Sequence, residues 1–158
     1  MRRWTKRQSL GKFDKVFIPV NISNAHWALL VIRMGAKTVS YYDSMNEDGS
    51  AYFDIILRDL EDESKRDAAL DKEPWVFGRR RWKCINAKTP QQINGYDCGV
   101  FVIQLIDLIS LDIPLLFGQA DMQVVRRRLL ASIFDRVSDP AGDRICSVAG
   151  VLEIDEDD

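Results

Sequence analysis

Cys98 stands at a predicted loop-to-helix junction, where a thiol can become a nucleophile. Polar residues 94–97 precede it and the apolar run 100–109 follows it. A thiol at a helix N-terminus meets unpaired backbone N–H groups and the positive end of the helix dipole, and both favour the thiolate. Asp97 stands where an N-cap residue is expected. The alternative is that Cys98 is a buried, unreactive cysteine, as most lone cysteines are.

The chain contains one histidine, His26, so any cysteine–histidine chemistry must use it. A histidine with an ordinary pKa of about 6.5 can take and return a proton at neutral pH. Asp43 ends the strand predicted over residues 38–42. If that strand pairs as a hairpin with the one beginning at His26, the Asp43 carboxylate lies within reach of the imidazole and fixes its tautomer. The alternatives are a surface or core histidine and an aspartate that serves a turn.

The segments that must position these side chains alternate between strand and helix patterns. Segment 15–22 is β-rich with period-two alternation at its start, 26–34 is an apolar run of strand length, and 38–42 follows a turn at 35–37; they predict three short strands that form an antiparallel meander. Helical spacing of apolar residues predicts three helices, over 51 to about 72, 100–109 and 119–137. A weakly signalled strand falls within 73–86, and a polar loop covers 88–96. The helix at 100–109 is apolar on most sides, which predicts burial, whereas the helix at 119–137 is amphipathic.

The composition is that of one soluble globular domain. The chain has 158 residues, of which 46% are hydrophobic and 29% charged, and a net charge of −2. This charge indicates neither a nucleic-acid binder nor a membrane binder, and no apolar run is long enough to span a bilayer or to form a secretory signal. Three cysteines without paired spacing argue against a disulfide framework or a zinc site, and favour a reducing compartment.

Several motifs together resemble those of the SUMO-specific Ulp/SENP cysteine proteases. They occur in that family's order and cover the chain from about residue 3 to residue 134; the block that ends at Phe101 is the most specific. The matching segments are 3–6 (RWTK), 18–22 (IPVNI), 26–27 (HW), 41–44 (YYDS), 90–101 (PQQINGYDCGVF) and 119–122 (QADM).

The resemblance implies a papain-like α+β fold, in which a short antiparallel meander packs against a buried helix with the nucleophile at its N-terminus. It implies that Cys98 is the nucleophile, His26 the general base and acid, and Asp43 the residue that orients His26. Gln92 matches the family's oxyanion glutamine, and Trp27 matches the aromatic residue that covers a diglycine in a narrow tunnel.

Two further residues are expected on the substrate side because of the same resemblance. They are Trp4, in the RWTK segment, and Gln91, which precedes the oxyanion glutamine. Plain loop polarity is the alternative for Gln91 and Gln92, and core packing is the alternative for part of the Trp27 ring. The arginine clusters 79–81 and 126–128 could face an acidic modifier surface or simply be solvated.

The resemblance assigns residues 1–138 to the catalytic domain and leaves 139–158 as a linker and acidic tail. The family's N-terminal helical portion has no counterpart ahead of Arg3, so we expect a chain that is short at its N-terminus. The implied partners are a SUMO-like modifier and its protein conjugates, without nucleic acid or membrane. No cofactor or metal is needed, and we expect a monomer in the nucleus, the cytoplasm or both.

The function implied is cleavage after the C-terminal Gly-Gly of a SUMO-like modifier, for precursor maturation, deconjugation or both. One alternative keeps the chemistry and changes the modifier to a NEDD8-like protein or ubiquitin. Another is a truncated relative that binds a modifier without cutting it. The presence of Cys98, His26, Asp43 and Gln92 argues against this second alternative.

Overall fold

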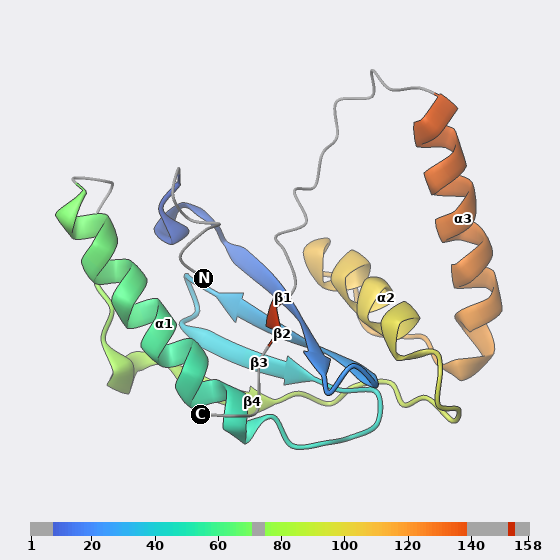
Figure 1. Ribbon diagram of the computed structural model, residues 1–158, viewed down its shortest axis with the longest axis horizontal. Helices are drawn as coiled ribbons and strands as arrows, with labels where there is room; N and C mark the ends of the chain where they lie inside the picture. The colour runs from blue at the N-terminus through green and yellow to red at the C-terminus, as the bar shows by residue number, and fades with distance from the viewer. Residues whose placement is uncertain (1–7, 71–74, 139–151, 154–158) are drawn as a thin grey trace.

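The computed structural model describes residues 8–70, 75–138 and 152–153, and their side chains up to residue 134. Strands and helices lie together in one α+β arrangement (Figure 1). In chain order its elements are η1 (Leu10–Lys12), β1 (Lys15–Ile22), β2 (His26–Arg33), β3 (Thr38–Tyr42), α1 (Ser50–Ala69), η2 (Arg79–Arg81), β4 (Lys83–Asn86), α2 (Cys98–Ser110), η3 (Gln119–Asp121), α3 (Met122–Ser138) and β5 (Leu152–Glu153).

The strands form one sheet in the order β4-β3-β2-β1-β5. Strands β1, β2 and β3 make the predicted antiparallel meander, with Ile22 opposite His26 and Leu29 opposite Tyr42. At the two edges β4 pairs with β3, and β5 with β1, in parallel. The sheet is therefore mixed, and two residues of the expected acidic tail belong to its edge.

Strand β2 is the centre of the molecule. Every residue from Ala28 to Ile32 is fully buried, because α1 covers one face of the sheet and α2 the other (Figure 1). Successive side chains of a strand point to opposite faces of the sheet. A strand that is covered on both faces therefore needs apolar residues at successive positions, which explains the unbroken apolar run in the sequence.

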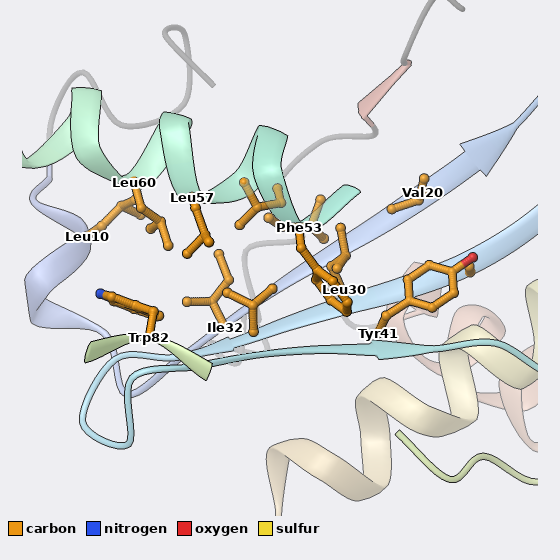
Figure 2. Packing of buried hydrophobic residues seen from close by; sticks show 13 residues of the cluster. Leu10, Val20, Leu30, Ile32, Tyr41, Phe53, Leu57, Leu60 and Trp82 are labelled. Atoms are coloured by element: carbon orange, nitrogen blue, oxygen red, sulfur yellow. The ribbon is translucent and has the colours of Figure 1, made fainter. Parts of the chain in front are cut away.

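The larger core cluster lies between the sheet and α1. Figure 2 shows side chains of the strands pointing toward those of the helix, with Leu30 and Ile32 facing Phe53 and Leu57. Leu60 and Trp82 close the far end of this cluster. The cluster holds α1 against the strands that carry His26 and Asp43 at their ends.

Gly49 lets α1 begin close to the sheet. A Cβ atom at this position would overlap the ring of Tyr41 on β3. The backbone N–H of Gly49 also donates to Asn86 Oδ1, 2.9 Å away on β4. A residue without a side chain is therefore required where the loop after Asp43 turns into the helix.

Helix α2 packs on the opposite face of the sheet and then against α3. Val102, Leu105 and Ile109 contact Leu29 and Val31 of β2. Nearer the start of α2, a third cluster joins the two helices through Val100, Phe101, Met122 and Val125. The prediction of a helix buried on most sides is confirmed, although Ile103 is 45% exposed.

Only part of the apolar side of α3, the helix predicted to be amphipathic, is buried. Met122 and Val125 are buried, but Leu130, Ile133 and Phe134 are each more than half exposed. The reason is that α3 contacts α2 only through its first turns, and the rest of the helix extends past the packed region (Figure 1). Of the linker and tail expected over 139–158, only Leu152 and Glu153 are among the described residues.

Candidate active site

His26 and Asp43 meet at the ends of two neighbouring strands. His26 begins β2 and Asp43 follows the last residue of β3. The imidazole Nε2 lies 3.0 Å from Oδ1 and 3.0 Å from Oδ2 of the carboxylate. Both side chains are buried, with residue exposures of 9% and 4%. The proximity expected from the hairpin is therefore confirmed.

Two further donors hold the Asp43 carboxylate in place. The Tyr41 hydroxyl donates to Oδ2 over 2.9 Å, and the Met45 backbone N–H donates to Oδ1 over 2.6 Å. Burial raises the pKa of Tyr41, and the nearby Asp43 carboxylate raises it further. Tyr41 therefore remains a protonated donor at neutral pH. Sequence reasoning did not identify Tyr41 as a site residue, although its place in the YYDS motif was a usable signal.

The other ring nitrogen of His26, Nδ1, has no hydrogen-bond partner among the described residues, and it is buried. Because buried polar atoms are nearly always hydrogen-bonded, such an atom in a native protein calls for an explanation. With Nε2 engaged by Asp43, Nδ1 is the atom that can exchange a proton with a neighbouring group.

Cys98 is the first residue of α2, as predicted, and is buried with 6% exposure. Its thiol is free. Asp97 occupies the N-cap position but its side chain makes no capping hydrogen bond, so the expectation that it caps α2 is wrong. The carboxylate instead accepts from Arg126 on α3. The Asp97 side chain therefore does not cap the N–H groups of the first turn of α2.

Trp27 brings the start of β2 to the start of α2. A Cβ atom on Gly99 would lie 3.8 Å from Cδ1 of the indole, an ordinary van der Waals contact. Trp27 follows His26 and Gly99 follows Cys98, so the residues next to His26 and Cys98 in the chain lie close to one another. Trp27 is half-buried, and its apolar ring packs beside the cluster between β2 and α2.

The glutamine loop is tied to the end of β3. The Gln92 backbone N–H donates to the Ser44 carbonyl over 2.9 Å, and the Ser44 hydroxyl donates to Gln92 Oε1 over 2.6 Å. Gln92 Nε2 donates to the Asn94 carbonyl, which leaves its second N–H unassigned. Gln91 is exposed, and its Nε2 donates to the carbonyls of Asp43 and Thr89 over 3.1 and 2.9 Å.

The remaining candidates make contacts within the protein or lie outside the described residues. Trp4 and Cys146 are outside the described residues. Arg79 pairs with Asp54 of α1, whereas Arg128 reaches Asp107 of α2. Together with Arg126, these arginines therefore make contacts within the protein.

The described part of the chain contains neither a cluster of possible metal ligands nor a helix that could span a membrane. There, no three His, Cys, Asp or Glu side chains come together in a way that could hold a metal ion. The described helices also lack the length and apolar character needed to cross a membrane.

Comparison with known proteins identifies the family to which this arrangement belongs. Residues 1–141 match the Ulp1 protease family, C-terminal catalytic domain. The chain belongs to this family. Among relatives of this Ulp1-family chain, sentrin-specific protease 2 of Homo sapiens is 35% identical over 135 residues, which cover 84% of the chain and 22% of the relative.

Solved structures similar to this Ulp1-family chain support the same assignment. The yeast C-terminal Ulp1 protease domain, in complex with Smt3, the yeast orthologue of SUMO, is 35% identical with a TM-score of 0.64; the match covers 80% of this chain and 55% of that one. The SUMO protease Ulp1 with its catalytic cysteine oxidised to a sulfenic acid is 33% identical with a TM-score of 0.69, over 86% and 60%. The resemblance to the Ulp/SENP proteases and the α+β fold are thus confirmed.

The chain is shorter than these proteins. It spans 22% of the length of sentrin-specific protease 2 and 55% of the Ulp1 domain bound to Smt3. The similarity therefore concerns the part of the catalytic domain that contains the residues described above.

Proposed function

We propose that this chain is a cysteine protease that cleaves after the C-terminal Gly-Gly of a SUMO-like modifier. The observation that carries the proposal is the different hydrogen bonding of the two ring nitrogens of His26. Asp43 binds Nε2, and the buried Nδ1 has no partner among the described residues. The names of the family's relatives, sentrin-specific proteases and Ulp1, support the choice of SUMO as the modifier.

The first chemical step joins Cys98 to the substrate. His26 Nδ1 takes the thiol proton, and the thiolate sulfur attacks the carbonyl carbon of the modifier's terminal glycine. Asp43 holds the other ring nitrogen as a donor, so Nδ1 is the basic one and the imidazolium that forms is stabilised. The carbonyl oxygen becomes an oxyanion and the carbon becomes tetrahedral.

Gln92 and the Cys98 backbone N–H are the proposed donors to this oxyanion. An amide side chain donates a hydrogen bond without offering an acidic proton to the thiolate, and one fixed donor is worth about 3 kcal/mol of barrier. The two hydrogen bonds between Gln92 and Ser44 support this role, because they fix the loop beside Asp43. The second N–H of Gln92 Nε2 is the one proposed to reach the oxyanion.

The second step releases both products. The bond from the carbonyl carbon to nitrogen breaks, and His26 returns its proton to the leaving lysine amine or peptide nitrogen. Water then attacks the thioester with His26 again as base, which gives the modifier carboxylate and the free thiol of Cys98. Maturation of a precursor and deconjugation use the same two steps.

Trp27, Gln91 and Trp4 are the proposed substrate-binding residues. The place of the Trp27 indole, between the start of β2 and the start of α2, supports a role against an extended glycine backbone. A flat ring beside a narrow channel selects glycine because any larger side chain would collide with it. Gln91, whose side-chain nitrogen is engaged by Asp43 and Thr89, would contact substrate through its exposed remainder.

The cellular context follows from this substrate. SUMO-like modifiers and their conjugates would be the partners of the chain. The chain would act on them as a monomer, in the nucleus, the cytoplasm or both. Residues 1–138 would form the catalytic domain, and 139–158 a linker and tail.

The decisive experiment is capture of Cys98 by a SUMO that carries a thiol-reactive group in place of its C-terminal carboxylate. Mass spectrometry should locate the adduct on Cys98, and neither Cys98→Ala nor His26→Ala should form it. Ubiquitin and NEDD8 probes with the same reactive group measure the choice of modifier. If the ubiquitin or the NEDD8 probe modifies Cys98 faster than the SUMO probe does, that modifier, and not SUMO, is the substrate.

Binding without reaction is the outcome that would overturn the enzymatic proposal. A SUMO that binds the chain, but whose probe leaves Cys98 unmodified and whose conjugates stay intact, would make the chain a modifier-binding module. Equal adduct formation by His26→Ala and the unchanged chain would show that His26 is not the base.

A further inference from the structure

The carboxylate of Asp97, next to Cys98 in the chain, faces away from α2 and toward α3. It accepts hydrogen bonds from Asn94 Nδ2 over 2.7 Å, Gln119 Nε2 over 2.6 Å and Arg126 Nε over 3.1 Å. Arg126 Nη2 adds a second bond from the same guanidinium group. Asp97 is buried with 4% exposure. We call Asn94, Asp97, Gln119 and Arg126 the Asp97 network.

The Asp97 network also binds the backbone of the loop before Cys98. Asn94 Oδ1 accepts from the N–H groups of Tyr96 and Asp97 over 3.2 and 3.1 Å. Gln119 Oε1 accepts from the N–H of Ile93 over 2.9 Å. Segment 93–97 is therefore tied at both ends to side chains that themselves converge on one carboxylate.

The charge on this carboxylate is compensated from α3. Desolvation by itself would raise the pKa of Asp97, but the hydrogen bonds from Asn94, Arg126 and Gln119 outweigh it and hold the pKa below its ordinary value. A paired arginine with two N–H groups on one carboxylate gives a strong and directional contact. Removing Arg126 would leave a buried charge with neutral donors alone.

We propose that Asn94, Asp97, Gln119 and Arg126 are positioning residues, which fix Gln92 and Cys98 relative to one another by anchoring the loop between them to α3. The inference rests on the proposed function, because Gln92 and the Cys98 N–H are there the two oxyanion donors. Such donors must be held within a fraction of an ångström of the productive geometry. The loop that joins them is neither helix nor strand, so hydrogen bonds from outside must hold it.

Arg128 provides a matched control for Arg126. Its Nη2 joins the same helix, α3, to α2, through Gln104 Oε1 over 2.6 Å and Asp107 Oδ2 over 3.0 Å. These contacts lie further along α2 than Cys98 and do not involve the loop. Arg126→Met thus removes an arginine contact from α3 to the loop before α2, and Arg128→Met removes an arginine contact from α3 to α2 itself. Only the first variant touches the Asp97 network.

The first measurement is hydrogen exchange of the loop amides in the full chain. Arg126→Met should speed exchange at Ile93, Tyr96 and Asp97 by roughly tenfold or more, since local opening sets the exchange rate. Arg128→Met should leave these amides within about twofold of the unchanged chain. Equal acceleration in both variants would mean general loosening of α3, and would overturn the inference.

The second measurement is steady-state cleavage of a fluorogenic SUMO C-terminal substrate under conditions where each variant is fully folded. Arg126→Met should lower kcat by about tenfold or more, as a small misplacement of catalytic groups does. KM should stay within about twofold, because substrate contacts are unchanged. Arg126→Lys, which keeps the charge but loses the two-pronged geometry, should recover part of kcat.

The two measurements separate this inference from the proposed function. If the unchanged chain cleaves no substrate, the proposed function fails, and the exchange comparison alone decides whether the network holds the loop. If Arg126→Met speeds loop exchange but leaves kcat unchanged, the loop is held by the network without serving catalysis, and the positioning role is wrong.

Discussion

His26 Nε2 lies 3.0 Å from both carboxylate oxygens of Asp43, across the ends of β2 and β3. This contact assigns different roles to the two ring nitrogens, since a nitrogen that donates to a carboxylate leaves the other as the base. It depends on the register that places Leu29 opposite Tyr42, because a shift of one residue would turn the Asp43 side chain to the other face of the sheet.

Replacing the carboxylate of Asp43 by an amide should remove this tautomer control. Asp43→Asn is expected to lower kcat by about 10⁴-fold with little change in KM, because the amide nitrogen favours the wrong tautomer. Asp54→Asn, an exposed carboxylate of α1 that pairs with Arg79, is the control and should keep the parental rate. A kcat for Asp43→Asn close to the parental value would show that Asp43 does not orient the base.

Removing the side-chain amide of Gln92 should affect the transition state alone. Gln92→Ala is expected to lower kcat by about 10²–10³-fold, which is the usual loss for one oxyanion donor. Gln123→Ala, on the exposed surface of α3, serves as the control. Full activity of Gln92→Ala would assign the oxyanion donors to other groups.

Tyr41→Phe tests whether the buried hydroxyl supports Asp43. Loss of the 2.9 Å bond should lower the free energy of unfolding by about 1–2 kcal/mol, because a buried acceptor loses a donor. Urea unfolding of Tyr41→Phe, Asp43→Asn and the double variant forms a thermodynamic cycle. The tyrosine substitution should matter less once Asp43 is replaced; strict additivity of the two losses would contradict direct coupling.

Gly49 and Gly35 make a matched pair of glycine substitutions. Gly49→Ala should lower the unfolding free energy by about 1–3 kcal/mol, because its methyl group would overlap the Tyr41 ring. Gly35→Ala meets no atom within 4 Å and should change stability by less than about 1 kcal/mol. Urea unfolding midpoints of the two variants check the difference between their stability losses. Equal losses would show that α1 can shift to accommodate the added methyl group without loss of stability.

The lowered pKa of Asp97 predicts a pH-dependent contribution to stability. A carboxyl group with a depressed pKa stabilises the fold fully above its ordinary value of 3.8, and this contribution is lost as pH falls through the folded-state pKa. The unfolding free energy of the chain should therefore exceed that of Asp97→Asn at pH 6, and the difference should shrink below pH 3.8. A difference that stays constant down to pH 2 would contradict the assignment.

Local patterns predicted much of this protein because they reflect short-range geometry. Period-two alternation at the start of β1, an apolar run of strand length and the segment after the turn at residues 35–37 located β1 to β3, and the apolar run after Cys98 located α2. The hairpin then placed Asp43 beside His26, because antiparallel pairing brings the end of one strand to the start of the other. Recognition of the motif around Cys98 added Gln92, whose role no periodic pattern indicates.

The same patterns failed where a contact depends on how distant elements dock. Asp97 was expected to cap α2, but Arg126, 29 residues further along, offers its carboxylate a stronger charged partner. The helix at 119–137 was predicted to be amphipathic, but only the first turns of α3 pack against α2. An amphipathic pattern indicates which face a helix would bury, and does not indicate how far a partner helix extends.

By itself, the sequence determined strands β1 to β3, the three α-helices and the chain order of His26, Asp43 and Cys98, since residue type and spacing specify these through local backbone geometry. Tertiary structure alone decided which imidazole nitrogen binds Asp43, that Tyr41 donates to this carboxylate, and that Arg126 of α3 binds Asp97. These relationships join side chains across the sheet or between helices, and their partners are selected by three-dimensional packing and charge.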